Sequence, residues 1–431
     1  MKLSFSLPSS SGRVVHVDLA SVSAVFPDAM IGGIVEVERM GRRPLLAEVI
    51  AIQDHRVTLA PWGETVGVRV DATVHFIAND AMQLCPDRSR GAVVCALGKD
   101  LHSGESLTTA GAVIETPSIR ERVARKVGVN TGLRAVDTLL PMVEGQRIGI
   151  FAGAGVGKTT LLTQLAQQVH ADRVVLCLIG ERSREAVSLV DSLRELSSWE
   201  RTTTIVATAD KAAALRVRAG ELAMNLAMQS RARGEHCLVL FDSLTRWVRA
   251  KREIALLSGE RPGRGGFPPS ALAALAPLIE TAGATHQGAV TSFFTVLLEG
   301  DEMDDPVGDE VRGLVEGHWI LSRRQAERQL FPAIDLRASL SRLAEEAVPQ
   351  DYVGTLRKLR AAWSALEELY EAEAFGLYAP GENARLDAIA SHRELFAQFQ
   401  RQDRSQESPR MQSLEDARQL ADYLESAGVL S

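Results

Sequence analysis

A glycine-rich segment between two regular stretches constrains this chain more than any other part of its sequence. Residues 148–152 read Ile-Gly-Ile-Phe-Ala, glycines follow, and a helical stretch begins at Lys158. The segment ends in Gly157-Lys158-Thr159 and fits the spacing of a phosphate-binding loop between a strand and a helix. Glycines there let successive main-chain N–H groups point at phosphate oxygens, and the helix N-terminus adds positive potential. The sequence therefore predicts a P-loop nucleotide site.

The side chains of this loop have predictable roles. Lys158 would reach the β- and γ-phosphates, and the hydroxyl of Thr159 would complete the coordination of Mg²⁺. Ala152 stands where the general pattern has its first glycine, and a small residue suffices there if its backbone angles are ordinary. A glycine-rich turn without a ligand is the alternative, but strand, loop, lysine and helix all favour a nucleotide. The loop residues expected to contact it are Gly153, Ala154, Gly155, Val156, Gly157, Lys158, Thr159 and Thr160.

Two further apolar runs lead into carboxylates. Residues 238–241 precede Asp242, which fits the Walker B aspartate that holds Mg²⁺ through water. Alone, such an aspartate is more often a helix N-cap or a turn residue, and the P-loop reverses that preference. Residues 174–179 lead through a glycine into Glu181, at the edge where α/β sheets place their ligands. Glu181 can polarise an attacking water there; a solvated helix start with Glu185 in its first turn is the alternative.

Three regions follow one another along the chain. In residues 1–78 short apolar runs alternate with polar residues and with turns that contain glycine or proline, which predicts a small β-barrel or sandwich. Residues 79–345 begin like a linker and continue with strands that alternate with helices, which predicts a parallel α/β domain. Residues 346–431 repeat apolar side chains at helical spacing and should form a helical domain. The clearest expected elements are strands 173–179, 204–209, 237–241 and 290–297 and helix 212–233.

Charge and cysteine content exclude several classes of protein. The 48 basic and 55 acidic residues give a net charge of -7, which argues against a surface that mainly binds nucleic acid. The four cysteines lie apart without a C-x-x-C pair, and we interpret them as reduced core thiols. Residues 1–11 hold one lysine and a short apolar patch, and no later run reaches the ~18 apolar residues of a membrane span. We therefore expect neither export nor a membrane-spanning segment.

Further blocks around these motifs carry a resemblance to a known family. They are Gly145-Gln146-Arg147, Gly180-Glu181-Arg182, Asp242 to Arg246, Gly266 to Ser270, Leu298 to Met303, Asp305-Pro306-Val307, Gly317-His318, Phe331 to Asp335 and Ser339 to Arg342. In this order they resemble the catalytic subunits of rotary ATP synthases and, more closely, the ATPases of flagellar and type III secretion export systems. The likeness is strong from about Thr131 to Arg342. It implies a RecA-like parallel-sheet core between a β-barrel and a helical C-terminal domain, with ATP and Mg²⁺ as cofactors.

The resemblance also implies roles for particular side chains. Glu181 would be the catalytic carboxylate, and Arg182 and Arg246 would lie near the γ-phosphate. Arg342 matches an arginine finger that a neighbouring subunit supplies to stabilise transition-state charge. Phe331 matches the aromatic residue that packs against adenine, although a Phe-Pro pair alone is more often simple core. Assembly into a homo-oligomeric ring, expected to be hexameric, would therefore control turnover.

The function that the resemblance implies is protein export. Hydrolysis would release chaperones from secreted proteins and unfold these proteins, in the cytoplasm at the cytosolic face of the inner membrane. Expected partners are like subunits, a central coiled-coil stalk protein, a negative regulator or stator protein, and secretion chaperones with their substrates, but no nucleic acid. The short N-terminus, which begins its barrel almost at once, favours the injectisome over the flagellum.

Two other functions stay open. A non-catalytic nucleotide-binding subunit of a rotary ATPase is one, and Glu181 argues against it because such subunits generally carry glutamine there. A Rho-like RNA translocase is the other. The acidic balance and the absence of an aromatic-and-basic platform argue against RNA as a partner.

Overall fold

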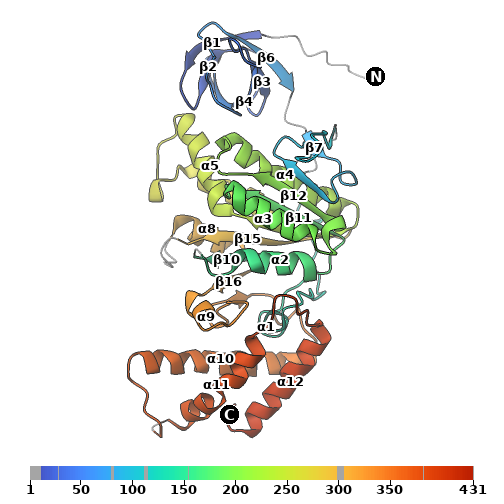
Figure 1. Cartoon of the computed structure of the whole chain (residues 1–431), viewed down its shortest axis with the longest axis vertical. Helices are drawn as coiled ribbons and strands as arrows, with labels where there is room; N and C mark the ends of the chain where they lie inside the picture. The colour runs from blue at the N-terminus through green and yellow to red at the C-terminus, as the bar shows by residue number, and fades with distance from the viewer. Residues whose placement is uncertain are drawn as a thin grey trace.

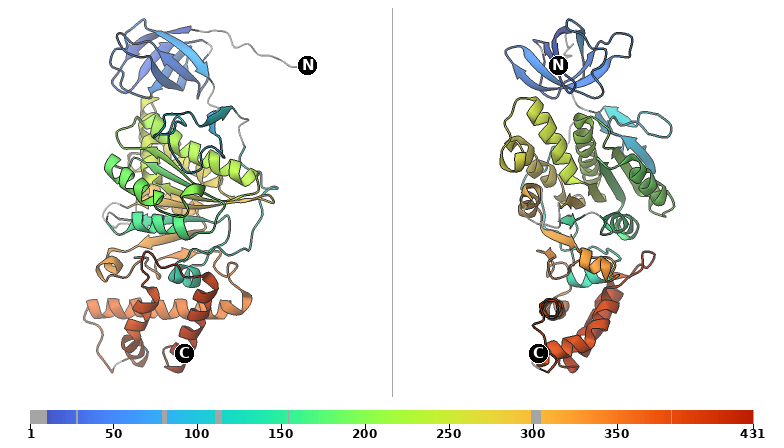
Figure 2. Two further views of the ribbon diagram at one scale, coloured as in Figure 1. Left: turned by 45° about the vertical axis from the view of Figure 1, so that its right-hand side comes forward. Right: turned by 60° about the vertical axis from the view of Figure 1, so that its left-hand side comes forward.

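The three predicted regions are stacked along one axis of an elongated molecule. The structure, a computed structural model, describes residues 11–27, 29–78, 82–110, 115–153, 155–298, 305–381 and 383–430. A barrel lies at one end, an α/β layer in the middle and a group of helices at the other end (Figure 1). Two other views show the same order (Figure 2). The predicted fold class is confirmed, and the N-terminal region is a barrel rather than a sandwich.

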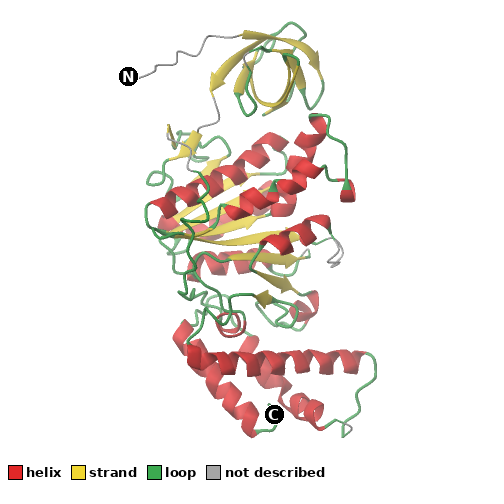
Figure 3. Ribbon diagram, turned by 180° about the vertical axis from the view of Figure 1, so that it is seen from behind, coloured by secondary structure: helices red, strands yellow, loops and turns green. Residues whose placement is uncertain are grey.

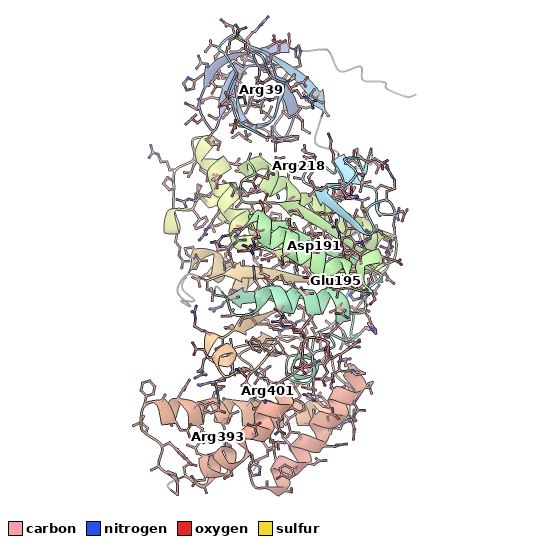
Figure 4. The ribbon with its side chains drawn as sticks, in the orientation of Figure 1. Arg39, Asp191, Glu195, Arg218, Arg393 and Arg401 are labelled. Atoms are coloured by element: carbon pink, nitrogen blue, oxygen red, sulfur yellow. The ribbon has the colours of Figure 1, made fainter. Side chains whose placement is uncertain are left out.

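The barrel closes in the order β1-β2-β5-β4-β3-β6, and β6 pairs back to β1. Its strands are β1 (Ser11–Val17), β2 (Val22–Val25), β3 (Ile34–Val37), β4 (Leu45–Gln53), β5 (Arg56–Pro61) and β6 (Thr73–Ala78). Side chains alternate between the two faces of a strand, so the buried Val14, Val35 and Leu59 fill the interior. Arg218, which faces the barrel (Figure 4), places its guanidinium 5.2 Å from the ring centroid of Trp62. The barrel therefore contacts the α/β layer directly.

The α/β layer is built on one mainly parallel sheet in the order β17-β16-β10-β15-β13-β11-β12-β8, with β14 beside β15. Its strands are β8 (Ala92–Cys95), β10 (Arg147–Ala152), β11 (Arg173–Ile179), β12 (Thr202–Ala207), β13 (His236–Asp242), β14 (Gly283–Ala284), β15 (Ala289–Leu297), β16 (Gly317–Leu321) and β17 (Leu340–Ser341). Only β14 and β17 pair antiparallel in this described sheet. A small ladder of β7 (Met82–Leu84) and β9 (Thr108–Ala110) lies outside it.

Helices cover both faces of this sheet (Figure 3), which explains why its central strands are apolar without alternation. One face packs α2 (Lys158–Gln168) and α3 (Ser183–Arg194) against every second residue of β11, among them Leu176. The opposite face packs α4 (Ala213–Ala232), α5 (Leu244–Leu257), α7 (Leu275–Glu280) and α8 (Pro306–Leu314) against the intervening residues, among them Cys177. The shorter elements are α1 (Arg134–Leu139), α6 (Pro269–Ala273), α9 (Arg323–Glu327) and the 3₁₀ turns Trp199–Arg201, Arg264–Gly266 and Gln350–Tyr352.

The C-terminal helices share a core with the α2 face of the sheet. They are α10 (Val353–Ala374), α11 (Ala384–Gln400) and α12 (Arg410–Ser426). The Trp363 ring lies 4.8 Å from Phe396 and 5.6 Å from Phe399, centroid to centroid. The same continuous cluster includes Leu161 and Leu165 of α2. The C-terminal helices and the helix that follows the P-loop therefore belong to one hydrophobic core.

The expected strands and helix of the α/β domain are present, with bounds within one residue of the prediction except for β12, which is shifted by two residues at both ends. The sheet strand β12 begins at Thr202, two residues before the prediction, because the buried hydroxyls of Thr202 and Thr203 donate to main-chain carbonyls at 2.7 and 2.8 Å. Cys177 and Cys237 are buried, and all four cysteines of the described chain are free. Among the described residues, no helix is both long and apolar enough to cross a membrane.

Candidate nucleotide-binding site

The P-loop has the predicted strand, turn and helix. Ala152 is fully buried at the end of β10, in regular pairing with β15 and β16, so the residue that replaces the usual glycine has ordinary extended backbone. Gly155 and Gly157 have φ angles of 79° and 95°, in the left-handed region that favours glycine. The helix α2 begins at Lys158 with Gly157 as its N-cap. Ala154, also expected to contact nucleotide, lies outside the described residues.

A cavity of about 490 Å³ opens beside this loop, within the size range of small-molecule sites. The predicted site residues that line it are Gly153, Gly155, Gly157, Lys158, Thr159, Thr160, Glu181, Arg182 and Arg246. A second cavity of about 800 Å³ shares Thr159, Thr160, Glu181 and Arg182 with the first and also reaches Asp242. Residues that are far apart in the sequence therefore meet in one region. Val156 belongs to the loop but turns its side chain into the core, where it is 2% exposed.

Four charged side chains form a compact cluster at this cavity. The Nζ atom of Lys158 forms an ion pair with Asp242 and lies 3.2 Å from Oε1 of Glu181. The guanidinium of Arg246 forms an ion pair with the same oxygen of Glu181. Thr295 Oγ1 donates a hydrogen bond of 2.7 Å to Oδ1 of Asp242 and fixes that carboxylate. Two cations thus balance two carboxylates in a largely buried space.

The charge state of Glu181 follows from these contacts. Burial opposes the charged form, but the hydrogen bond from Arg246 and the charges of Lys158 and Arg246 outweigh it and lower the pKa of Glu181 to about 2. Glu181 is therefore a carboxylate at neutral pH and can accept a hydrogen bond from water. A triphosphate that draws Lys158 away would remove one of these charges, so the pKa of Glu181 would rise towards its usual value.

We expect Arg246→Ala to move the acid limb of the pH–activity profile upwards. The variant loses the hydrogen bond and one of the two cations that lower the pKa of Glu181, so the carboxylate becomes protonated at a higher pH. The measurement is kcat/KM for ATP from pH 8 down to about pH 3, a range that extends below the usual pKa of a glutamate side chain. The matched control is Lys251→Ala, on the same helix but paired with Glu221, and it should keep the wild-type profile. An unshifted acid limb in Arg246→Ala would show that Glu181 does not control it.

Asp242 and Glu181 are both buried, and neither is the N-cap of the helix that follows it. Ser243, not Asp242, is the N-cap of α5, and Asp242 closes β13 with its side chain 2% exposed. Glu185 does lie in the first turn of α3 and pairs with Arg182 at 3.5 Å on the surface. Glu181 instead faces the cations of the cavity. Arg182 borders the same cavity, but its side chain is 83% exposed.

Phe331 lies beside the P-loop although it comes 174 positions after Gly157 in the chain. A Cβ atom added to Gly157 would stand 3.8 Å from the Phe331 ring, and Phe331 is 42% exposed. An open aromatic face next to a phosphate-binding loop suits the stacking of a nucleobase.

Arg342 lies away from this cavity, at the opposite edge of the sheet. Its main-chain N–H donates to the carbonyl of Glu316 at 2.9 Å, level with Arg147 at the beginning of β10. The P-loop follows Ala152 at the other end of β10, about 17 Å away at roughly 3.3 Å per residue. Arg342 is exposed. Arg342 therefore does not reach the P-loop of its own chain.

Sequence reasoning missed Thr295, which holds the Asp242 carboxylate. It also missed Arg404 and Ser405, which border the larger cavity and belong to the connector, residues 401–409 between α11 and α12. Thr295 had a signal, because it is a polar residue inside the apolar run 290–297. Arg404 and Ser405 had no such signal, since the polar residues of the connector resemble a flexible segment.

Comparison with known proteins identifies the family. Residues 132–341 match the model of the ATP synthase alpha/beta family nucleotide-binding domain, and residues 348–419 match that of the T3SS EscN ATPase C-terminal domain. A type 3 secretion system ATPase of Pseudomonas syringae pv. syringae is 36% identical over 428 residues, which cover 96% of this chain and 94% of the relative. The chain belongs to the type 3 secretion and flagellar ATPase family.

Relatives of this chain come from both branches of the family, the type 3 secretion ATPases and the flagellar ATPases. A flagellum-specific ATP synthase of Treponema pallidum is 38% identical over 392 residues, which cover 89% of this chain and 87% of the relative. The assembled ATPase EscN of the enteropathogenic E. coli type III secretion system is similar in structure, with a TM-score of 0.87 and 32% identity over 95% of this chain and 100% of that chain. EscN in complex with its central stalk EscO gives a TM-score of 0.85 at 31% identity, with the same coverage. The chain is thus a P-loop ATPase of the EscN type.

Proposed function

We propose that this ATPase hydrolyses Mg²⁺-bound ATP in a homo-oligomeric, hexameric ring and energises protein export by a type III secretion system. One observation carries the proposal. Lys158, Glu181, Asp242 and Arg246 converge on the P-loop cavity, while the exposed Arg342 lies at the opposite edge of the sheet. Each chain then holds an almost complete site and presents the missing cation to a neighbour.

The donors at the site fit a magnesium ion. Magnesium prefers hard oxygen ligands and keeps several waters, and the Thr159 hydroxyl and the Asp242 carboxylate are such donors beside the cavity. Among the described residues no group of three or more His, Cys, Asp or Glu side chains could hold a metal ion alone. Thr159 directly and Asp242 through water would therefore hold Mg²⁺ together with phosphate oxygens. The ion would neutralise charge on the β- and γ-phosphate oxygens.

Within the ring, each side chain has a separate task in hydrolysis. Lys158 binds the terminal phosphates, and the carboxylate of Glu181 orients and polarises the attacking water. Arg246 and Arg182 lie at the γ-phosphate end of the cavity, and Phe331 packs against adenine. Arg342 of the adjacent subunit stabilises the charge that develops in the transition state.

The proposed partners follow from the relatives. EscN is described as assembled and as bound to its central stalk EscO, so we assign a coiled-coil stalk protein to the ring formed by this chain. A negative regulator or stator protein and secretion chaperones with their substrates complete the set. The ring would sit at the cytosolic face of the inner membrane as a peripheral component of the export apparatus, where hydrolysis releases chaperones and unfolds substrates.

We favour the injectisome over the flagellum. Residues 348–419 match a C-terminal domain model named for EscN, and EscN also aligns over 95% of this chain. Flagellar relatives are equally similar in sequence, so the choice needs a cellular experiment.

The experiment deletes the gene in its own bacterium and restores either the wild type or Glu181→Gln. Loss of the carboxylate should reduce turnover by about 10²- to 10⁴-fold while ATP still binds, so secretion into the medium should not recover and swimming should stay normal. Glu195→Gln, at the far end of α3 (Figure 4), is the matched control and should restore secretion. Secretion restored by Glu181→Gln would refute the catalytic role, and lost swimming with intact secretion would assign the chain to the flagellum.

A further inference from the structure

Three consecutive residues at the end of α11 hold the loop that carries Phe331. We call residues 329–334 the base loop. Its main-chain carbonyls accept hydrogen bonds from the Gln400 side chain at Ile334 (3.0 Å), from the Arg401 side chain at Gln329 (3.4 Å) and from the main-chain N–H of Gln402 at Phe331 (2.8 Å). Arg401 marks this junction between the C-terminal helices and the α/β layer (Figure 4). The base loop is therefore fastened to the C-terminal region.

Gln402 is the most firmly anchored of the three. Its side chain accepts from the N–H of Arg134 at 2.9 Å and donates to the carbonyls of Gly132 and Gln406 at 2.6 and 2.7 Å. Gln402 is 4% exposed, and both hydrogens of its amide are used. Removal of this amide would take away the acceptor of the Arg134 N–H, while the carbonyls of Gly132 and Gln406 would keep the N–H of Ser408 at 3.0 Å and the Gln168 side chain at 3.1 Å. A buried glutamine with this many main-chain contacts fixes the backbone on both sides of it.

Gly132, which accepts a hydrogen bond from Gln402, also packs against α2, the helix that follows the P-loop. Gly132 has a φ of 71°, and an added Cβ atom would lie 2.7 Å from the Cβ atom of Gln168, so the backbone presses against α2. Gln168 also donates to the carbonyl of Gln406 at 3.1 Å. The segment around Gln402 is thus fixed between the base loop and the helix whose first residue is Lys158.

We propose that Gln402 is a positioning residue for the nucleotide base. Its side chain holds the connector on Gly132, and its main-chain N–H sets the position of Phe331 beside Gly157. The inference rests on the proposed function only in that ATP occupies the P-loop cavity. Gln402 would thus contribute to the affinity for the base and not to the affinity for the triphosphate, although it contacts neither part of the nucleotide.

The test compares a ligand with a base and a ligand without one. In the full-length protein, Gln402→Ala should raise the Kd of ATP about tenfold, the size expected for the loss of one or two buried hydrogen bonds. The Kd of inorganic tripolyphosphate and kcat at saturating ATP should stay within about twofold. If Gln402→Ala does not fold, Gln402→Met keeps the side-chain volume and should give the same separation.

A second comparison asks whether the effect passes through Phe331. In a Phe331→Ala background, Gln402→Ala should weaken ATP binding by no more than about twofold further, because the ring that it positions is already gone. Gln419→Ala, an exposed glutamine of α12 paired with Glu415, is the matched control and should change neither Kd.

Each failure has a distinct meaning. Unchanged ATP affinity, additive effects of Gln402→Ala and Phe331→Ala, or an equal loss of tripolyphosphate binding would overturn the positioning role. A wild-type protein that binds neither ligand would instead overturn the proposed function.

Discussion

Lys158→Ala is expected to abolish ATP hydrolysis and to weaken nucleotide binding. The alanine removes the cation that would reach the β- and γ-phosphates, and with it the ion-pair partner of Asp242, and it leaves Glu181 paired with Arg246. Both carboxylates would then repel an incoming triphosphate. Phosphate release measures turnover, and calorimetric titration with an ATP analogue measures affinity.

The design of this test separates charge from fold. Lys251→Ala is the matched control, since this lysine of α5 pairs with Glu221 of α4 and should keep full activity. The loss of one partner from a buried ion cluster costs on the order of 3–5 kcal/mol, so the melting temperature of Lys158→Ala should also fall. Retained turnover in a folded Lys158→Ala protein would refute the assignment of the P-loop.

Arg342→Ala is expected to leave ATP binding nearly intact and to reduce turnover by about 10³-fold or more. Arginine fingers act on transition-state charge, and their loss lowers kcat by about 10³- to 10⁵-fold. Arg342 lies about 17 Å from its own P-loop along β10, at roughly 3.3 Å per residue, so ground-state binding within one chain should not need it. Kd and kcat measured side by side provide the test.

Mixed rings test whether the finger acts between subunits. Rings of Glu181→Gln alone or of Arg342→Ala alone should both show strongly reduced turnover. In a mixture, an Arg342→Ala subunit keeps its own carboxylate and can receive Arg342 from an adjacent Glu181→Gln subunit, so part of the activity should return. If mixed rings are as inactive as rings of either variant alone, Arg342 does not act on the site of a neighbouring subunit.

Local pattern predicted the parts of the fold whose physics is local. The P-loop strand, turn and helix were predictable because glycine, lysine and apolar run all lie within a dozen residues, and β11 and β13 were predictable because both faces of the sheet are covered. The closure of the N-terminal strands into a barrel was not predictable from local pattern, since polar and apolar residues alternate in the same way along the strands of a barrel and of a sandwich. The strand β8 was not predicted either, because its sheet partner β12 lies more than 100 residues further along the chain.

The site shows the same division. Lys158 and Asp242 were predictable from motif spacing, and Glu181 from its place at a strand end. The roles of Arg342 and Phe331 came from the family resemblance alone, because neither is near the P-loop in the sequence. The contacts of Gln402 could not be predicted from the sequence, since its side chain accepts a hydrogen bond from Arg134, 268 residues earlier in the chain.

Closure of the N-terminal barrel limits how neighbouring chains can adhere. Through described residues 11–27 and 29–78, every strand of the barrel has a partner on both sides, so no row of main-chain N–H and C=O groups is left to join a strand from another molecule. Adjacent barrels in a ring would then meet without pairing of their strands. Such a junction can slide or tilt by small amounts during turnover without breaking a ladder of backbone hydrogen bonds.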